Sequence, residues 1–216
     1  MPVTEEKPRK RRMSAADRRE AILDAALEEF AQNGYHETSL EGVAERAGIS
    51  KALIYEHFNS KRDLHDALLG RYVHELLERF IGAIASAAPP EERLKAAADA
   101  FLGFVEDHRE PWRLMVRAPA DSGVAATVGQ QQSEIAHAIA ALMQADAPPE
   151  MREAPDEGRF EVEMMAQQLV GAWRAVAIWW DDHRDVSRER LLATLMDLAW
   201  VGLERVSQGE TWDGPR

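Results

Sequence analysis

The stretch "VAERAGISKALIYEHFNSKRDL", Val43–Leu64, places two short apolar-patterned segments on either side of a single glycine. Gly48 can adopt the left-handed conformation that a tight turn needs, and Ser50 can cap a helix that follows it. Ile54 and Phe58 share one face of that second segment and would pin it against a core. The pattern therefore predicts two short helices joined by a tight turn, which is the helix-turn-helix arrangement.

The second of these helices, predicted over residues 51–57, is too short to be stable alone. Its outer face is therefore a candidate recognition surface. Tyrosine and histidine each carry a polar tip on an apolar body, so they can pack at a core edge and reach a phosphate oxygen. Lys61 falls in the first turn of the next helix, where a cation is out of place unless it serves an outside anion. We predict DNA-backbone contacts at Ser39, Tyr55, His57 and Lys61.

Outside this stretch the apolar residues also recur with a period of about 3.6, and no strand or hairpin signal is present. We predict an all-α chain of about nine helices. The first helix starts at a Ser14 cap and ends at "NGY", and Thr38 or Ser39 caps the second. The later helices are expected at about 61–87, 91–108, 111–117, 122–145, 159–182 and 187–207. The predicted domains are a disordered basic arm (1–13), a helix-turn-helix DNA-binding head (14–60) and a ligand-binding and dimerisation body (61–216).

The net charge of −12 is unevenly distributed along the chain. Residues 1–62 carry 11 basic and 11 acidic residues, whereas residues 63–216 carry 15 basic and 27 acidic ones. This asymmetry favours a head that can approach a polyanion and a body that avoids one. The segment Lys7–Arg12 holds five positive charges and no negative one. It is either an arm that adds phosphate or minor-groove contacts, or a solubilising tail.

The composition excludes several other classes of protein. The chain has no cysteine, which rules out disulfides and thiolate zinc sites and fits a cytoplasmic location. The polar N-terminus is no secretory signal, and the longest apolar run, "AVAIWW", is too short to span a membrane. Glycine-rich phosphate loops and His-Glu-x-x-His are missing, so we predict neither an enzyme nor a cofactor. An all-α hydrolase site in the body remains the enzymatic alternative.

"WWDDHRD", Trp179–Asp185, is the one metal-like cluster in the sequence. Its acidic and histidine side chains could ligate a divalent ion. Adjacent residues on a helix point in different directions, however, so we interpret the cluster as a solvated helix end and predict no metal. The residues concerned are Asp181, Asp182, His183 and Asp185.

From Ile22 to Leu69 the sequence resembles the TetR family of bacterial transcriptional repressors. The resemblance rests on Ala-Gly-Ile-Ser-Lys, Ile-Tyr-x-His-Phe and Ser-Lys-x-x-Leu at the family's spacing, and covers about a quarter of the chain. It implies a homodimer, a palindromic operator in double-stranded DNA, and a small-molecule effector whose binding to the body releases the DNA. A transcriptional activator on the same scaffold is the alternative.

The resemblance also assigns individual positions. It matches the four predicted backbone contacts, and it places four further residues opposite the bases: Ser50, Lys51, Ala52 and Leu53. Ala52 stands where many members carry glycine. Glu56 lies near the presumed DNA face, where it either accepts from a cytosine amino group or points to solvent.

The last two predicted helices, 159–182 and 187–207, are apolar around most of their girth. Such helices are buried on both sides, either within one subunit or between a subunit and a partner. Together with the resemblance, this pattern favours a homodimer in which both helices of each subunit form a four-helix interface.

Aromatic and thioether residues in the body suggest an apolar or aromatic effector, although such residues are also common in plain cores. His108 is either the polar anchor of that ligand or a helix-end histidine near solvent. The predicted ligand-binding residues are Phe101, Phe104, His108, Trp112, Met115, Met143, Met165 and Trp173.

Overall fold

The computed structural model describes residues 13–85, 88–116, 124–146 and 156–207. These residues form nine helices and no strand, which confirms the predicted all-α fold. The chain divides into two compact units, residues 1–68 and 69–216, and the boundary falls inside helix α4 (Lys61–Ile84). In the described residues no helix is long and apolar enough to cross a membrane. The predicted basic arm lies almost wholly outside the described residues.

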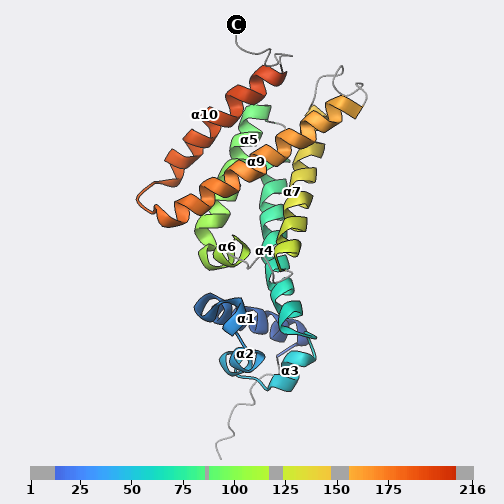
Figure 1. The fold of residues 1–216 in the computed structure, drawn as a ribbon, viewed down its shortest axis with the longest axis vertical. Helices are drawn as coiled ribbons and strands as arrows, with labels where there is room; N and C mark the ends of the chain where they lie inside the picture. The colour runs from blue at the N-terminus through green and yellow to red at the C-terminus, as the bar shows by residue number, and fades with distance from the viewer. Residues whose placement is uncertain (1–12, 86–87, 117–123, 147–155, 208–216) are drawn as a thin grey trace, which may run out of the picture. The chain divides into compact units, whose positions relative to one another are not determined.

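The first unit contains α1 (Ala15–Glu37), α2 (Leu40–Ala47), α3 (Lys51–Tyr55) and the start of α4 (Figure 1). Helix α1 packs against α2, and α2 packs against α3. Their inward side chains form a buried apolar core whose members recur at helical spacing. The largest of them are Ile22, Leu23, Phe30, Ile54, Phe58 and Leu64.

Helix α1 begins at the predicted cap and is broken at the predicted glycine, after which a short helical segment continues to Glu37. The Ser14 hydroxyl accepts from the Asp17 N–H at 3.0 Å, and the Asp17 carboxylate accepts from the Ser14 N–H at 3.3 Å, so the capping box is present. Gly34 has φ 73° and ψ 171°, a non-helical conformation that interrupts the helix at the predicted glycine. One further turn continues to Glu37, where the buried Thr38 hydroxyl donates to the Gly34 carbonyl at 2.7 Å.

The second unit contains the rest of α4 and five more described helices: α5 (Pro90–Asp107), α6 (Arg109–Val116), α7 (Val124–Asp146), α9 (Asp156–Asp182) and α10 (Arg188–Ser207). Helix α7 packs along α9, and α10 packs along α5 (Figure 1). The α7–α9 contact is centred on the small or branched residues Ala140, Val162 and Ala166, which allow close helix packing.

Ion pairs join the helices of the second unit. The Arg188 guanidinium binds the Asp99 carboxylate through two bonds of 2.9 and 2.6 Å, which ties α10 to α5. Asp181 is only 7% exposed and accepts from Arg113 Nε at 2.7 Å. The prediction that "WWDDHRD" is wholly a solvated helix end is therefore wrong for Asp181, which is buried and paired. No group of three or more potential metal ligands occurs in the part of the chain that the structure describes.

Candidate nucleic-acid interface

The turn between α2 and α3 has the geometry that its sequence predicts. Gly48 lies in the left-handed region, with φ 66° and ψ 33°. The Ile49 N–H donates to the Ala44 carbonyl at 3.0 Å, and the Gly48 N–H to the Glu45 carbonyl at 3.1 Å. These bonds satisfy the free carbonyls at the end of α2 and set the direction in which α3 leaves the turn.

Helix α3 is held from one side and open on the other. Ser50 caps it by accepting from the Leu53 N–H at 3.4 Å, while Ile54 and Phe58 are fully buried beneath it. The helix ends at Tyr55 instead of residue 57, because the His57 N–H donates to the Ile54 carbonyl at 2.9 Å in a tighter turn. The outer face carries three residues: Lys51 and Ala52, both exposed, and Leu53, half-buried.

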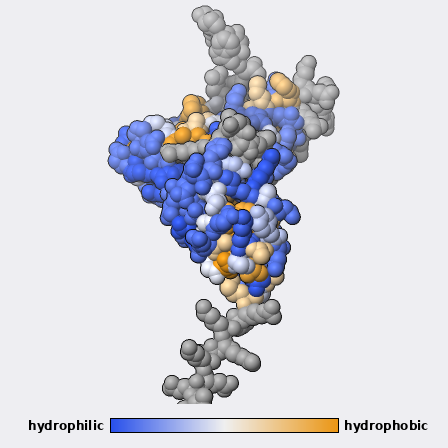
Figure 2. Space-filling model, turned by 60° about the horizontal axis from the view of Figure 1, so that its bottom comes forward, coloured by the Kyte–Doolittle hydropathy of each residue, from blue (hydrophilic) through white to orange (hydrophobic). Residues whose placement is uncertain are grey.

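Tyr55 is 50% exposed at the end of α3, and its hydroxyl is a hydrogen-bond donor. Figure 2 shows hydrophobic residues among hydrophilic ones on the surface that faces the viewer. A surface of this mixed kind suits both apolar contact with thymine methyl groups and polar contact with phosphates.

Ser39, not Thr38, is the residue that caps α2. Its hydroxyl oxygen accepts from the Gly42 N–H at 3.0 Å and is exposed, so its own O–H is free to donate outward. The Val43 N–H donates to the Ser39 carbonyl at 3.2 Å, so Ser39 satisfies two backbone donors in the first turn of α2.

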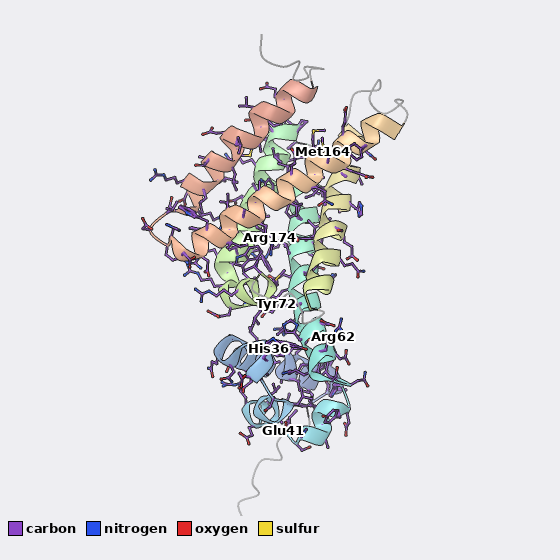
Figure 3. The ribbon with its side chains drawn as sticks, in the orientation of Figure 1. His36, Glu41, Arg62, Tyr72, Met164 and Arg174 are labelled. Atoms are coloured by element: carbon purple, nitrogen blue, oxygen red, sulfur yellow. The ribbon has the colours of Figure 1, made fainter. Side chains whose placement is uncertain are left out.

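Lys51 is paired in the free protein. Its ammonium group hydrogen-bonds the Glu41 carboxylate, which raises the pKa of Lys51 and lowers that of Glu41. Figure 3 labels Glu41 on α2. The Lys51 ammonium also lies 5.9 Å from the centre of the Tyr55 ring. Lys51 would have to exchange this carboxylate for a phosphate or a base edge to contact DNA.

Lys61 has a role inside the head that the sequence did not reveal. Its ammonium donates to the His36 carbonyl at 2.9 Å and to the Thr38 carbonyl at 3.0 Å, and it lies 4.9 Å from the centre of the Tyr35 ring. The lysine therefore ties the first turn of α4 to the negative end of α1. Two of its three donors are used in this way, which leaves one for a phosphate.

His57 is half-buried beside Phe58, with their ring centres 6.4 Å apart. Its Nε2 atom is buried and has no hydrogen-bond partner among the described residues. Buried polar atoms of this kind are uncommon, so His57 is poised to gain a partner if its side chain turns outward.

Arg46 positions the interface without belonging to it, and the sequence analysis did not single it out. Its guanidinium bonds three side chains of α1: Glu28 at 2.9 Å, Glu29 at 3.1 Å and Gln32 at 2.7 Å. This fork fixes α2 on α1. Its partners are two adjacent glutamates and a glutamine one turn later on α1, and the sequence carries no signal that singles out this arrangement.

The second unit encloses an apolar cavity of about 60 Å³ between α4, α5, α6, α7 and α9. Almost no polar surface faces it. Four of the eight predicted ligand-binding residues line its wall: Phe101, Trp112, Met115 and Trp173. The same wall includes one arginine, Arg174, which Figure 3 labels on α9.

The other four predicted ligand-binding residues lie elsewhere. Phe104 is buried with its ring centre 4.9 Å from that of His108. His108 Nε2 is 2.7 Å from the Glu75 carboxylate, so its polar atom serves an α4–α5 link. Met143 and Met165 pack against the α7–α9 cluster. The structure thus brings half of the predicted set together.

Helices α9 and α10 expose large apolar side chains. Phe160, Met164 and Trp179 on α9, and Leu198 and Val201 on α10, are each at least 44% exposed. Isolated exposed apolar residues are ordinary, but five of them along two successive helices make these helices candidates for association.

The head combines a left-handed glycine turn, a pinned short helix and polar groups beside it, which defines a helix-turn-helix DNA-binding regulator. The profile described as bacterial regulatory proteins, tetR family, matches residues 22–68, and that of the tetracyclin repressor-like C-terminal domain matches residues 90–202. The chain belongs to the TetR family of transcriptional regulators, as the sequence predicted.

Similar proteins include both activators and repressors. The HTH-type transcriptional activator FasR of Mycolicibacterium smegmatis is 30% identical over 198 residues, 90% of this chain and 87% of FasR. The HTH-type transcriptional repressor KstR2 of Mycobacterium tuberculosis is 34% identical over 91 residues, 42% of this chain and 46% of KstR2. A solved TetR-like regulator from Rhodococcus sp. RHA1 matches with a TM-score of 0.71 and 30% identity, covering 89% of this chain and 99% of that one.

Proposed function

We propose that this regulator binds a palindromic operator as a homodimer, represses transcription from the cytoplasm, and is released by a small apolar effector. The observation that carries the proposal is the outer face of α3, which is open while Ile54 and Phe58 hold the inner face in the core. A helix held in this way has the size to enter a major groove.

Contacts on both sides of α3 would fix its register. The Ser39 hydroxyl offers a phosphate contact before α3, and Tyr55, His57 and the third donor of Lys61 offer such contacts after it. Ser50, Lys51, Ala52 and Leu53 would then face the bases. The domain limits of this proposal remain residues 14–60 for the head and 61–216 for the body.

A homodimer follows from the shortness of the recognition helix. One α3 reaches only a few base pairs, so two copies about 34 Å apart are needed to bind successive major grooves. The exposed apolar residues of α9 and α10 offer the self-complementary surface that a two-fold dimer requires.

The effector is proposed to enter the apolar cavity of the second unit. At about 60 Å³ the cavity is too small for a typical ligand, whose sites measure roughly 300 Å³ or more. Binding would therefore have to move its walls, and α4 both lines the cavity and continues into the head. A ligand that favours one arrangement of the walls can change the operator affinity in this way.

The test is a salt titration of DNA binding, measured by fluorescence anisotropy with duplexes from the region upstream of the gene. Tyr55→Phe and Lys51→Ala should weaken binding, and Lys51→Ala should lower the salt slope by about one. Lys95→Ala, which removes an exposed lysine from α5, is the control and should bind as the wild type does. Wild-type affinity and slope in both head variants would contradict the proposed interface.

Activation is the second candidate function, because the relative FasR, which matches over 90% of this chain, is named as an activator. A reporter fused to the bound promoter decides between the two. Deleting the regulator gene raises the reporter signal if the protein represses and lowers it if the protein activates.

A further inference from the structure

Arg174 is unusual among the half-buried arginines of the second unit. Arg79, Arg113, Arg184 and Arg188 each pair with a carboxylate. Arg174, by contrast, forms no ion pair or hydrogen bond with any described residue. Its own helix offers it no carboxylate, since one turn away on either side stand only Val, Gly, Ala and Ile.

The position of Arg174 relates this free charge to the cavity. The cavity wall contains Arg174, yet almost no polar surface faces inward, so the alkyl stem of the arginine lines the wall and its guanidinium lies at the edge. A guanidinium at the edge of an apolar cavity is complementary to an amphiphile, which joins a charged group to an apolar body.

The register of α7 and α9 places a second polar group at the same end. Met143 and Ala140 of α7 pack near Val162 and Ala166 of α9, whereas residues 132–139 share the cavity with residues 170–174. The helices are therefore antiparallel, and Gln132 lies about level with Arg174. Gln132 is the one amide side chain in the described wall, beside the indole N–H groups of Trp112 and Trp173. Its amide can donate a hydrogen bond to the group that Arg174 binds.

We infer that the effector is an anionic amphiphile, with a carboxylate or similar head held by Arg174 and Gln132 and an apolar body in the cavity. This inference rests on the proposed effector site and adds the charge and polarity of its ligand. Arginine suits such a head because its planar fork matches a carboxylate and stays charged at all relevant pH values. A neutral alcohol could fill the apolar cavity with its chain but would leave the guanidinium of Arg174 unpaired, and a cationic amphiphile would be repelled by it.

The test compares matched straight-chain probes, from hexanoate to tetradecanoate, with the primary alcohols and amines of the same lengths, each below its aggregation concentration. Binding is followed by calorimetry and by the fluorescence of Trp112 and Trp173, which line the cavity. We expect the best carboxylate to bind the wild type roughly 10- to 100-fold more tightly than its alcohol, because hydrogen bonds to a charged group are strong. The amine should be the weakest of the three.

Two variants assign the preference to Arg174. Arg174→Gln should lower the affinity for the carboxylate to that for the alcohol and leave the alcohol unchanged, while Arg174→Lys should keep part of the preference. Arg190→Gln removes an exposed charge from α10 and should behave as the wild type. Operator binding by each variant in the absence of probe shows that it is folded.

The possible failures are distinguishable. Equal affinities of the wild type for carboxylate and alcohol, or a preference that survives in Arg174→Gln, would overturn the inference and leave the apolar effector site intact. Absence of binding by every probe, with operator binding preserved, would overturn the proposed effector cavity itself and this inference with it.

Discussion

At the scale of single residues, His65 shows how the core of the head sets a protonation state. Its ring is 2% exposed and meets the rings of Phe30 and Tyr35 edge-on, at 4.9 and 5.0 Å. Burial lowers the pKa of His65 from 6.5 to about 4. The nearest carboxylate, Asp66, is 4.0 Å away and also pairs with Arg62. The histidine is therefore neutral in the folded protein at neutral pH.

This shift makes stability depend on pH. Between pH 6.5 and about 4 the unfolded chain binds a proton that folded His65 does not, so stability falls as the pH falls through this window. The loss attributable to His65 is about 3 kcal/mol. His65→Phe should remove this loss of stability. The free energy of unfolding is measured by urea denaturation at pH 7.5 and 4.5 for both proteins. Subtracting the change in the variant from the change in the wild type removes the contribution of the other titrating groups. An identical pH slope in both proteins would contradict this account.

The Lys51–Glu41 pair predicts a gain in DNA binding from a single change. Glu41→Gln removes the carboxylate that holds Lys51 and a negative charge near the proposed phosphate path. We expect several-fold tighter binding to any duplex at low salt, with the advantage shrinking as salt rises. Glu91→Gln, at an exposed position of α5, is the control. Unchanged affinity in Glu41→Gln would mean that Lys51 stays away from the DNA.

The partners of Lys61 inside the head could not be predicted from its position in the sequence. A lysine at a helix N-terminus predicts a contact with an outside anion such as a phosphate. In the structure the carbonyls of His36 and Thr38 supply the negative partner instead. These carbonyls belong to the short segment that follows the break at Gly34, and the sequence pattern does not show where that segment lies. Lys61→Ala would therefore disturb the head as well as any DNA contact, and Tyr55→Phe is the cleaner probe.

At the scale of elements, the periodic apolar pattern predicted every described helix to within a few residues, because each helix buries one stripe. It placed the end of α3 less well, since that end depends on local hydrogen bonds that carry little periodic signal. The same pattern identifies inward residues but cannot say which inward residues border a cavity. Phe101 and Trp173 line the cavity, whereas Met143 and Met165 pack in the α7–α9 contact, and the pattern does not distinguish the two cases.

The α2–α3 turn predicts a test on glycine. Gly48→Ala forces an L side chain into the left-handed region and should lower the unfolding free energy by about 1–2 kcal/mol. It should also weaken operator binding, because the turn directs α3. Gly70→Ala, in the open interior of α4, is the matched control and should raise stability by up to about 1 kcal/mol. Thermal melts and anisotropy measure both effects, and equal melting temperatures for the two variants would contradict the role of Gly48.

At the scale of the whole molecule, the proposed approach of the first unit to DNA and the proposed separation of the second unit from it explain why the charge is uneven along the chain. Residues 1–62 carry 11 basic and 11 acidic residues, with five of the basic ones in Lys7–Arg12, and two cations of the head, Arg46 and Lys51, are held by carboxylates. These carboxylates should restrain non-specific attraction to DNA, so that in the proposed dimer a second head on the same operator would be the main route to tight binding. Operator affinity should consequently depend on dimerisation more than on any one contact.

The dimer proposal can be tested at Leu198, which is 78% exposed on α10. Leu198→Glu places a charge in the proposed interface, where it would be buried without a partner, so the protein should become monomeric. Sedimentation equilibrium measures the mass, and anisotropy should show weak operator binding with the salt dependence of a single head. Ile81→Glu is the matched control, because Ile81 is a 60% exposed apolar residue on α4. If the Leu198→Glu protein remains dimeric, α10 does not form the centre of the dimer interface. If it is a monomer with full operator affinity, two heads are not needed for tight binding.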